Sequence, residues 1–457
     1  MPRSSPSDAF AAESLTRAPW LAAAVFSALA AVAFAWPSWP GYMSYDSLFA
    51  YEQARYGVGT SLWPPLHTYM FIASRAVGAD TWGVLIAQSF ALLFGAALVL
   101  HSLIARRALA WTLWALFVGG LVFFPTLLGS MMAHWRDVPT GSFSVLGFGL
   151  WLQAARLRSW PLLILAVVSF GVSVGLRYNA FVLAAPALLL MVWRPFLAAA
   201  TPMAARAATL ALVIASLGLA WASTQWRLPD LVRLPDARNI AGTQLFDVIG
   251  ISACSGVNYL PRGVTAGQPI TVAQIRRAYD PRHLLSTLAV YPGQPRLIET
   301  DAGGQVGETW ARLLTAEPGC YVAHRSAVFA EQMGMLKSEV FYPVHGGIDA
   351  NAFGLALSHP DLAAKVRGYV TRTAPEFPRR PFWLYLGAIV LGLAAAARAR
   401  AHALLLLSIL AGVLAYPALL FIAGPAADAR YIFPSNATAL LLCIVSLGLL
   451  AGRGSRR

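Results

Sequence analysis

The chain has 457 residues, of which 58% are hydrophobic and 12% are charged, and its formal net charge is +14. A soluble protein of this length carries about twice that charged fraction, so the composition excludes a water-soluble globular protein. Apolar runs long enough to cross a hydrocarbon layer of ~30 Å recur along the chain and predict an all-α polytopic membrane protein. The basic excess fits the positive-inside bias of membrane proteins, so we expect membrane lipids and no nucleic acid as partners.

The first apolar run covers residues 20–36 and follows a polar leader that contains Arg3 and Arg17. The run is followed by Pro-Ser-Trp-Pro, without a clear A-x-A site for cleavage of a signal peptide. We therefore expect a cytoplasmic segment 1–19 and a retained first span.

Arginines in alternate gaps between the apolar runs set the topology. If these gaps face the cytoplasm, the scheme closes with about ten spans and with both termini cytoplasmic, in a bacterial inner membrane. The predicted spans are 20–36, 83–105, 109–128, 138–155, 160–176, 179–193, 204–223, 382–397, 402–422 and 432–451. The predicted domains are a transmembrane module 20–223 with a first outer loop 37–82, an extracytoplasmic loop domain 224–380, C-terminal transmembrane helices 381–451 and a cytoplasmic tail 452–457.

The segment 64–78 is apolar but too short to be a span, because its apolar stretch reaches only about 20 Å as a helix. Its Pro-Pro pair suits the first turn of a helix, so we expect an interfacial helix in the first outer loop. The loop 224–380 is polar and carries helical patterns at TVAQIRRAYD and EPGCYVAHRSAVFAEQMGM. Cys254 and Cys320 both fall in this loop, and they could pair if it faces an oxidising compartment.

Two acidic residues stand out near the outer ends of the first spans. Ionisable residues at membrane depth are costly and usually need a partner or a function. Asp46 lies among aromatic residues soon after the first span, and Asp137 follows Arg136 where the chain turns back toward the bilayer. Two plainer interpretations stay open, namely a solvated loop carboxylate for Asp46 and a local Arg–Asp pair with helix capping for Asp137.

The order of these motifs resembles the GT-C glycosyltransferases, polytopic enzymes that include protein mannosyltransferases and aminoarabinose transferases and use polyprenyl-phosphate-linked sugars. The resemblance covers roughly the first 180 residues and one later piece. Its motifs are Asp46 in SYDSLFAYEQ, Pro64-Pro65-Leu66 in WPPLHTY, Arg136-Asp137 in HWRDVP, GLRYNAF at 175–181 and ADARYIFPS at 427–435. Unlike characterised members, the chain has neither paired acids beside the first Asp nor a histidine before the Pro pair, and it lacks WWD and DxD sequences.

The resemblance implies an inverting transfer of a hexose or pentose from a polyprenyl-phosphate-linked donor to an unknown acceptor on the extracytoplasmic face. Asp46 would be the general base, and Asp137 would orient the acceptor or hold Arg136. The leaving phosphate would need cations nearby. The substrate-binding candidates are Arg136, Arg177, Arg325 and Arg430, with His67 and His324 as neighbours. We expect no cofactor, and the sequence leaves a divalent metal open.

Two other functions compete with this one. A transporter or flippase for a lipid-linked glycan would show inverted repeats and ionisable residues near the bilayer midplane, whereas here the acids gather near one interface. An O-antigen-ligase-like enzyme would rely on arginine and histidine side chains of the large outer loop. The sequence does not identify the sugar, the acceptor or the oligomeric state.

Overall fold

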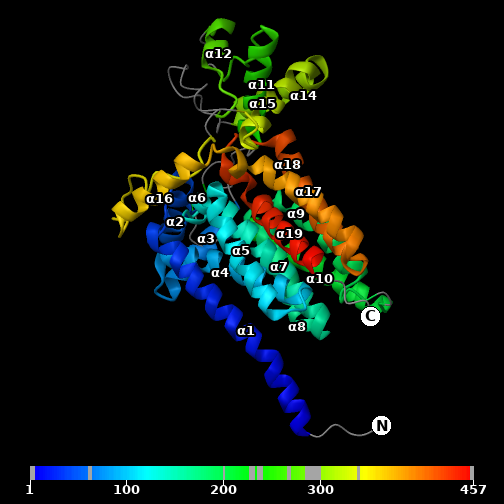
Figure 1. Ribbon diagram of the computed structural model, residues 1–457. Helices are drawn as coiled ribbons and strands as arrows, with labels where there is room; N and C mark the ends of the chain where they lie inside the picture. Colours follow the sequence, from blue (N-terminus) through cyan, green and yellow to red (C-terminus); the bar gives the residue numbers. More distant parts are fainter. Residues whose placement is uncertain are drawn as a thin grey trace.

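The computed structural model describes residues 6–59, 64–198, 201–225, 232–233, 240–264, 269–283, 300–336 and 340–452. The protein is an all-α polytopic membrane protein, in which a tilted bundle of long helices carries a cap of shorter helices at one end (Figure 1). Among the described residues, strand structure is limited to β1 (Val58–Gly59) and β2 (Val232–Arg233), which pair in parallel.

The elements before the loop domain form most of the bundle. They are α1 (Pro6–Ala35), η1 (Trp36–Ser38), α2 (Tyr45–Tyr56), α3 (Leu66–Ala76), α4 (Asp80–Leu103), α5 (Arg107–Phe123), α6 (Pro125–Met131), α7 (Asp137–Leu157), α8 (Trp160–Leu176), α9 (Ala180–Trp193) and α10 (Met203–Gln225). The later elements form the cap, a lateral helix and the last spans. They are α11 (Ala241–Ser255), α12 (Val272–Ala278), α14 (Thr300–Ala316), α15 (Pro318–Gln332), α16 (Pro360–Thr373), η2 (Phe377–Arg379), α17 (Pro381–Arg398), η3 (Arg400–His402), α18 (Ala403–Ala423), η4 (Ala429–Ile432) and α19 (Phe433–Ala451).

Helices occupy all ten segments that the sequence predicts as spans. In the described part of the chain, six candidate spans are long and apolar enough to cross a membrane. They are Trp20–Ser38, Asp80–Leu103, Met203–Ala222, Pro381–Arg398, Arg400–Ala423 and Ala429–Ala451. The predicted spans 160–176 and 179–193 are apolar helices of 17 and 14 residues, which is shorter than the ~20 residues that a full crossing needs.

The predicted span 109–128 is not one straight helix. Taken together, α5 and α6 are long and apolar enough to count as a seventh span. The two helix axes, however, are bent by 88° relative to each other. The break falls at Phe124 and Pro125, because proline lacks an N–H and disfavours helical backbone in the residue before it.

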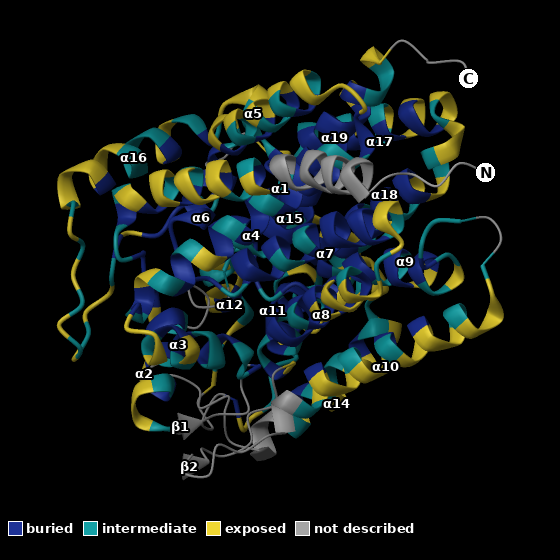
Figure 2. Cartoon of the chain, turned by 90° about the horizontal axis from the view of Figure 1, so that it is seen from below, coloured by how far each residue is buried: buried dark blue, intermediate teal, exposed yellow. Residues whose placement is uncertain are grey.

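The predicted span 138–155 coincides with α7, a 21-residue helix in the interior of the bundle that is not among the six candidate spans. It packs against α4 through glycines: a Cβ added at Gly149 would lie 2.6 Å from the Gly95 carbonyl oxygen. Such close approach of helix backbones is typical of membrane interiors. Seen from below, buried residues fill α4, α7 and α19, whereas exposed residues line α10 and α16 at the periphery (Figure 2).

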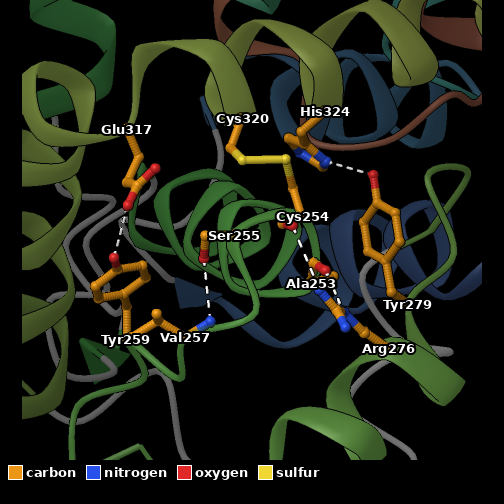
Figure 3. Close-up of a disulfide and its surroundings, with 10 residues drawn as sticks. All are labelled: Ala253, Cys254, Ser255, Val257, Tyr259, Arg276, Tyr279, Glu317, Cys320 and His324. Atoms are coloured by element: carbon orange, nitrogen blue, oxygen red, sulfur yellow. Dashed lines mark hydrogen bonds between the residues drawn. A yellow bond between two sulfur atoms is a disulfide. The ribbon is translucent and has the colours of Figure 1, made fainter.

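The first outer loop contains the helix predicted within 64–78, which is α3, and a further short helix, α2. α2 begins at Tyr45, and α3 begins at Leu66, directly after the Pro-Pro pair. The cap contains both helices whose patterns the sequence shows, α12 and α15. Cys254 at the end of α11 and Cys320 in α15 form a disulfide, which answers the pairing that the sequence left open (Figure 3).

Candidate functional site

Three chain segments that are far apart in sequence meet at the cap end of the bundle. Tyr42 pairs with Ala133 and Met43 pairs with Ile348 in two isolated parallel bridges. The Met43 N–H donates to the Gly347 carbonyl oxygen at 2.9 Å. The segment that leads into α2 is therefore held between the start of the α6–α7 turn and a stretch of the long loop, so its position depends on both.

Asp46 forms an ion pair with an arginine near the C-terminal end of the chain. It stands in the first turn of α2, and its Oδ2 lies 3.0 Å from Nη2 of Arg430 in η4. Arg430 also contacts Asp428 at 3.1 Å and lies over the ring of Trp135, 5.2 Å from its centroid. One guanidinium is thus shared between two carboxylates and is supported from one side by an aromatic ring.

Asp137 forms a second ion pair beside the first. Its Oδ1 lies 2.8 Å from Nε of Arg177, and the Asp137 side chain is 1% exposed. Arg177 and Arg430 both lie over the ring of Tyr431, at 4.8 and 5.0 Å from its centroid. The two ion pairs are therefore joined through one aromatic side chain.

Arg136 completes this group through its electrostatic coupling to its charged neighbours. We call the group the six-charge cluster, and its three acids balance its three arginines. Its members are Asp46, Arg136, Asp137, Arg177, Asp428 and Arg430. Their helices and turns are α2, the α6–α7 turn, α7, the α8–α9 turn and the segment before α19.

Burial and the neighbouring arginines act in opposite directions on the pKa values of Asp46 and Asp428. Burial alone would raise the pKa of Asp46, but Arg430, Arg136 and Arg177 outweigh it and lower that pKa below its usual value. For Asp428, burial prevails over Arg430 and raises the pKa. Burial and the nearby Arg177 lower the pKa of Arg136 to about 10. An additional anion beside Arg136 would raise this pKa again, because an opposite charge favours the charged form of the guanidinium.

His67 was predicted to contact substrate, and the structure places it in the packing beside the site. It is 1% exposed, and its ring lies 4.9 Å from that of Phe71, which in turn lies 5.4 Å from the ring of His134. Burial holds the pKa of His67 well below its usual value, so the ring is neutral. These contacts favour a role in positioning α3 over direct contact with substrate.

His324 and Arg325 have a different set of partners from the other predicted site residues. Both pair with Asp247 of α11, at 3.3 and 2.7 Å, and all three side chains are 0% exposed. Arg325 donates a further hydrogen bond to the Gly424 carbonyl oxygen at 2.6 Å, and Trp310 donates to Asp247 at 2.7 Å. We call these residues the Asp247 cluster. The ion pair of Arg325 joins α15 to α11 within the cap, and its hydrogen bond to Gly424 joins the cap to the end of α18.

Several residues of the site escaped the sequence analysis. Asp428 and Tyr431 lie within the ADARYIFPS motif, so their neighbourhood was found although their roles were not. Trp135 precedes the Arg136-Asp137 pair and supports Arg430. The long loop also contributes through YPVHGGIDAN at 342–351, where tyrosine, histidine and aspartate fall close together without forming a known motif. Among the residues that the structure describes, no group of three or more His, Cys, Asp or Glu side chains could hold a metal ion.

Comparison with known proteins gives only a distant likeness. No protein-family model matches the sequence, and no curated protein matches it. Two solved structures of ArnT from Cupriavidus metallidurans resemble the chain, one bound to undecaprenyl phosphate and one in the apo state. They are 12% and 13% identical to it, cover 94% and 96% of this chain and 77% and 78% of their own, and have TM-scores of 0.33 and 0.32. Similarity at this level assigns no activity to this chain.

Proposed function

We propose that this protein is an inverting glycosyltransferase that moves a sugar from a polyprenyl-phosphate-linked donor to an acceptor on the extracytoplasmic face of the membrane. The observation that carries the proposal is the six-charge cluster. Residues from the motifs SYDSL, HWRDVP, GLRYN and ADARY, which are spread over almost the whole chain, contact or couple to one another in it. Chance solvated charges would have no reason to gather at one place.

The arginines of the cluster suit the leaving phosphate. Guanidinium groups bind phosphate in a bidentate manner and remain charged at any physiological pH. Arg430 is the best placed of the three, because it already shares its donors between Asp46 and Asp428. A donor phosphate would take over one of these contacts, and the same cations would stabilise the charge that develops on the phosphate as the sugar leaves.

Asp46 is the acid of the cluster that a substrate can reach. Its side chain is 30% exposed, compared with 1% for Asp137 and 9% for Asp428. In the proposed reaction Asp46 accepts the proton of the acceptor hydroxyl while the oxygen attacks the anomeric carbon. The bond from that carbon to the phosphate oxygen breaks on the opposite side, which inverts the configuration.

The ion pair with Arg430 controls the strength of this base. While Arg430 holds Asp46, the carboxylate has a lowered pKa and is a weak proton acceptor. A phosphate that draws Arg430 away would raise the pKa of Asp46 toward its usual value. The proton acceptor would thus become stronger only when the donor is bound.

Asp137 has a different proposed role. Its ion pair with Arg177 is almost completely enclosed, so neither an acceptor nor a donor can reach its bonded oxygen without displacing Arg177. We assign Asp137 to holding Arg177, where the sequence analysis had it orient the acceptor or hold Arg136. An O-antigen-ligase-like mechanism would need exposed arginine and histidine in the long loop, and the enclosure of His324 and Arg325 removes these two residues as its candidates.

The test uses purified protein in nanodiscs with a panel of polyprenyl-phosphate-linked sugars, and it follows release of polyprenyl phosphate. The parent should turn over at least one donor, and Asp46→Asn should lower the rate by about 10²- to 10⁴-fold, the usual contribution of a general base. Asp361→Asn is the matched control, because this carboxylate is exposed in the first turn of α16. If no donor turns over, or if Asp46→Asn behaves like Asp361→Asn, the transporter interpretation replaces the enzyme.

A further inference from the structure

A tyrosine of the long loop is held in an unusual backbone conformation beside the six-charge cluster. Tyr342 has a φ of +53°, in the left-handed region that bulky residues seldom adopt. Such strain persists only where the surrounding structure enforces it, and it is common at functional sites. Hydrogen bonds anchor the chain on both sides of Tyr342: the Ala429 N–H donates to the Phe341 carbonyl oxygen before it, and Met43 bonds to residues 347 and 349 after it.

Tyr342 begins a chain of three side chains in polar contact, of which the first two are hydrogen-bonded and the last two form an ion pair. Its hydroxyl is hydrogen-bonded to Nδ1 of His345, and Nε2 of His345 lies 3.2 Å from Oδ1 of Asp349. The ionised Asp349 can only accept, so Nε2 of a neutral His345 carries the hydrogen and Nδ1 is an acceptor. The Tyr342 hydroxyl must then donate its proton to His345, which leaves the phenol oxygen free to accept a hydrogen bond and unable to donate another.

The chain runs from the six-charge cluster toward solvent. The Tyr342 ring lies 5.7 Å from the ring of Trp135, the same ring that supports Arg430. The charges of Arg430, Asp428 and Asp46 all act on the Tyr342 hydroxyl. At the other end His345 is 6% exposed, whereas Asp349 is 48% exposed. The phenol therefore belongs to the proposed donor site, and its orientation is fixed from outside that site.

We propose that Tyr342 recognises a hydroxyl group of the donor sugar, with His345 and Asp349 as positioning residues that hold the phenol oxygen as an acceptor. This inference rests on the proposed function. The sugar is attached directly to the phosphate, and Tyr342 shares Trp135 with Arg430, which would bind that phosphate. A sugar hydroxyl donates readily to such an oxygen, whereas a carbonyl or a carboxylate at the same position has no hydrogen to give.

The arrangement also makes sugar recognition depend on pH. A proton on Nδ1 of His345 turns that atom into a donor, so the phenol hydrogen turns toward the site and the oxygen no longer serves a sugar hydroxyl. The charged and titratable groups that face His345 are Asp349, Arg430 and Tyr342. Burial lowers the pKa of His345 below its usual value, Asp349 opposes this, and Arg430 adds to it. The KM for the donor should therefore rise as the pH falls through the acid range.

The experiment compares Tyr342→Phe with the parent on the donor found in the panel and on its monodeoxy analogues. Tyr342→Phe should raise the donor KM roughly 2- to 12-fold, the effect of losing one neutral hydrogen bond, with a smaller change in kcat. One deoxy analogue should bind equally poorly to both proteins, because the variant and the analogue remove the same hydrogen bond. Tyr56→Phe makes the same chemical change at an exposed position of α2 and should alter nothing.

A second variant distinguishes a loss of sugar recognition from a structural change in the loop that carries Tyr342. His345→Gln keeps the Tyr342 hydroxyl but removes the imidazole. We expect the donor KM of the parent to rise at acid pH, and we expect no such rise in His345→Gln or in Tyr342→Phe. Equal losses on the parent donor and every deoxy analogue would overturn the inference, since they would indicate a structural role for the loop. Loss of turnover in Asp46→Asn would still uphold the proposed function in that case, so the two failures can be told apart.

Discussion

The six-charge cluster and the Asp247 cluster are both built from ion-paired arginine and aspartate side chains, but they differ in how far they are enclosed. In the cap, Asp247 accepts hydrogen bonds from Arg325 and Trp310 and lies 3.3 Å from His324, and the side chains of the ion-paired members are 0% exposed. In the six-charge cluster, Arg430 divides its donors between two carboxylates, one of which is 30% exposed. A fully enclosed group whose charges are paired within the protein is closed to a ligand, so its role is to hold the fold together. A shared and partly open group can exchange one partner for a ligand.

Asp247→Asn should have the largest effect on stability. Removing one partner of a buried ion pair leaves an uncompensated charge on Arg325 and costs about 3–5 kcal/mol. We expect a large fall in the thermal unfolding temperature of the purified protein. Asp46→Asn should change stability much less while lowering the turnover rate by about 10²- to 10⁴-fold. Equal destabilisation by the two variants would remove the distinction between the clusters.

Removal of the disulfide between Cys254 and Cys320 should have the next largest effect on stability. Cys254 and Cys320 are separated by 66 residues, and a crosslink of that span contributes about 4 kcal/mol in the chain-entropy description. The variant that carries both Cys254→Ser and Cys320→Ser should unfold at lower temperature than the parent, as should the parent in reductant. Reductant should have no further effect on the double variant, and any such effect would point instead to Cys443, a buried free cysteine of α19.

Arg430→Lys and Arg325→Lys test the comparison at its two arginines. Lysine keeps the charge but cannot reproduce the planar fork of guanidinium donors. Arg430→Lys should raise the donor KM roughly 10- to 100-fold, as expected for a lost charge-assisted hydrogen bond, with little loss of stability. Arg325→Lys should instead lower the unfolding temperature and leave the KM of the remaining folded protein unchanged. The reverse pattern would place the phosphate site in the cap.

The pH dependence of stability should show the smallest difference. The pKa of Asp46 is lowered in the folded protein, so its ion pair stabilises the fold above the usual carboxyl pKa of about 3.9. This contribution is lost as the pH falls through the lowered value. The difference in unfolding temperature between the parent and Asp46→Asn should therefore shrink in acid, and a difference that grows would contradict the direction of the shift.

The helices could be predicted from the sequence because apolar length and basic gaps are local properties. The start of α3 after the Pro-Pro pair was predictable for the same reason, whereas the break at Phe124 was missed although Pro125 signals it. The sequence could not predict that Arg325 and Arg430 belong to different clusters, since both are predicted loop arginines beside other ionisable residues. Only the tertiary structure decides which of them is enclosed. The segment 342–349 was equally hidden, because its relevance depends on pairing with Met43.

The order in which the ion pairs of the six-charge cluster form follows from the order in which the chain is translated. Asp137 and Arg177 come from neighbouring helices, so their pair can form while the first half of the chain is being inserted. Asp46 must wait for Arg430, which is synthesised only shortly before the last helix. A nascent chain that stops before this point leaves a carboxylate at the membrane without its counter-ion. The Asp46–Arg430 pair can therefore form only in a chain whose synthesis has reached the start of α19.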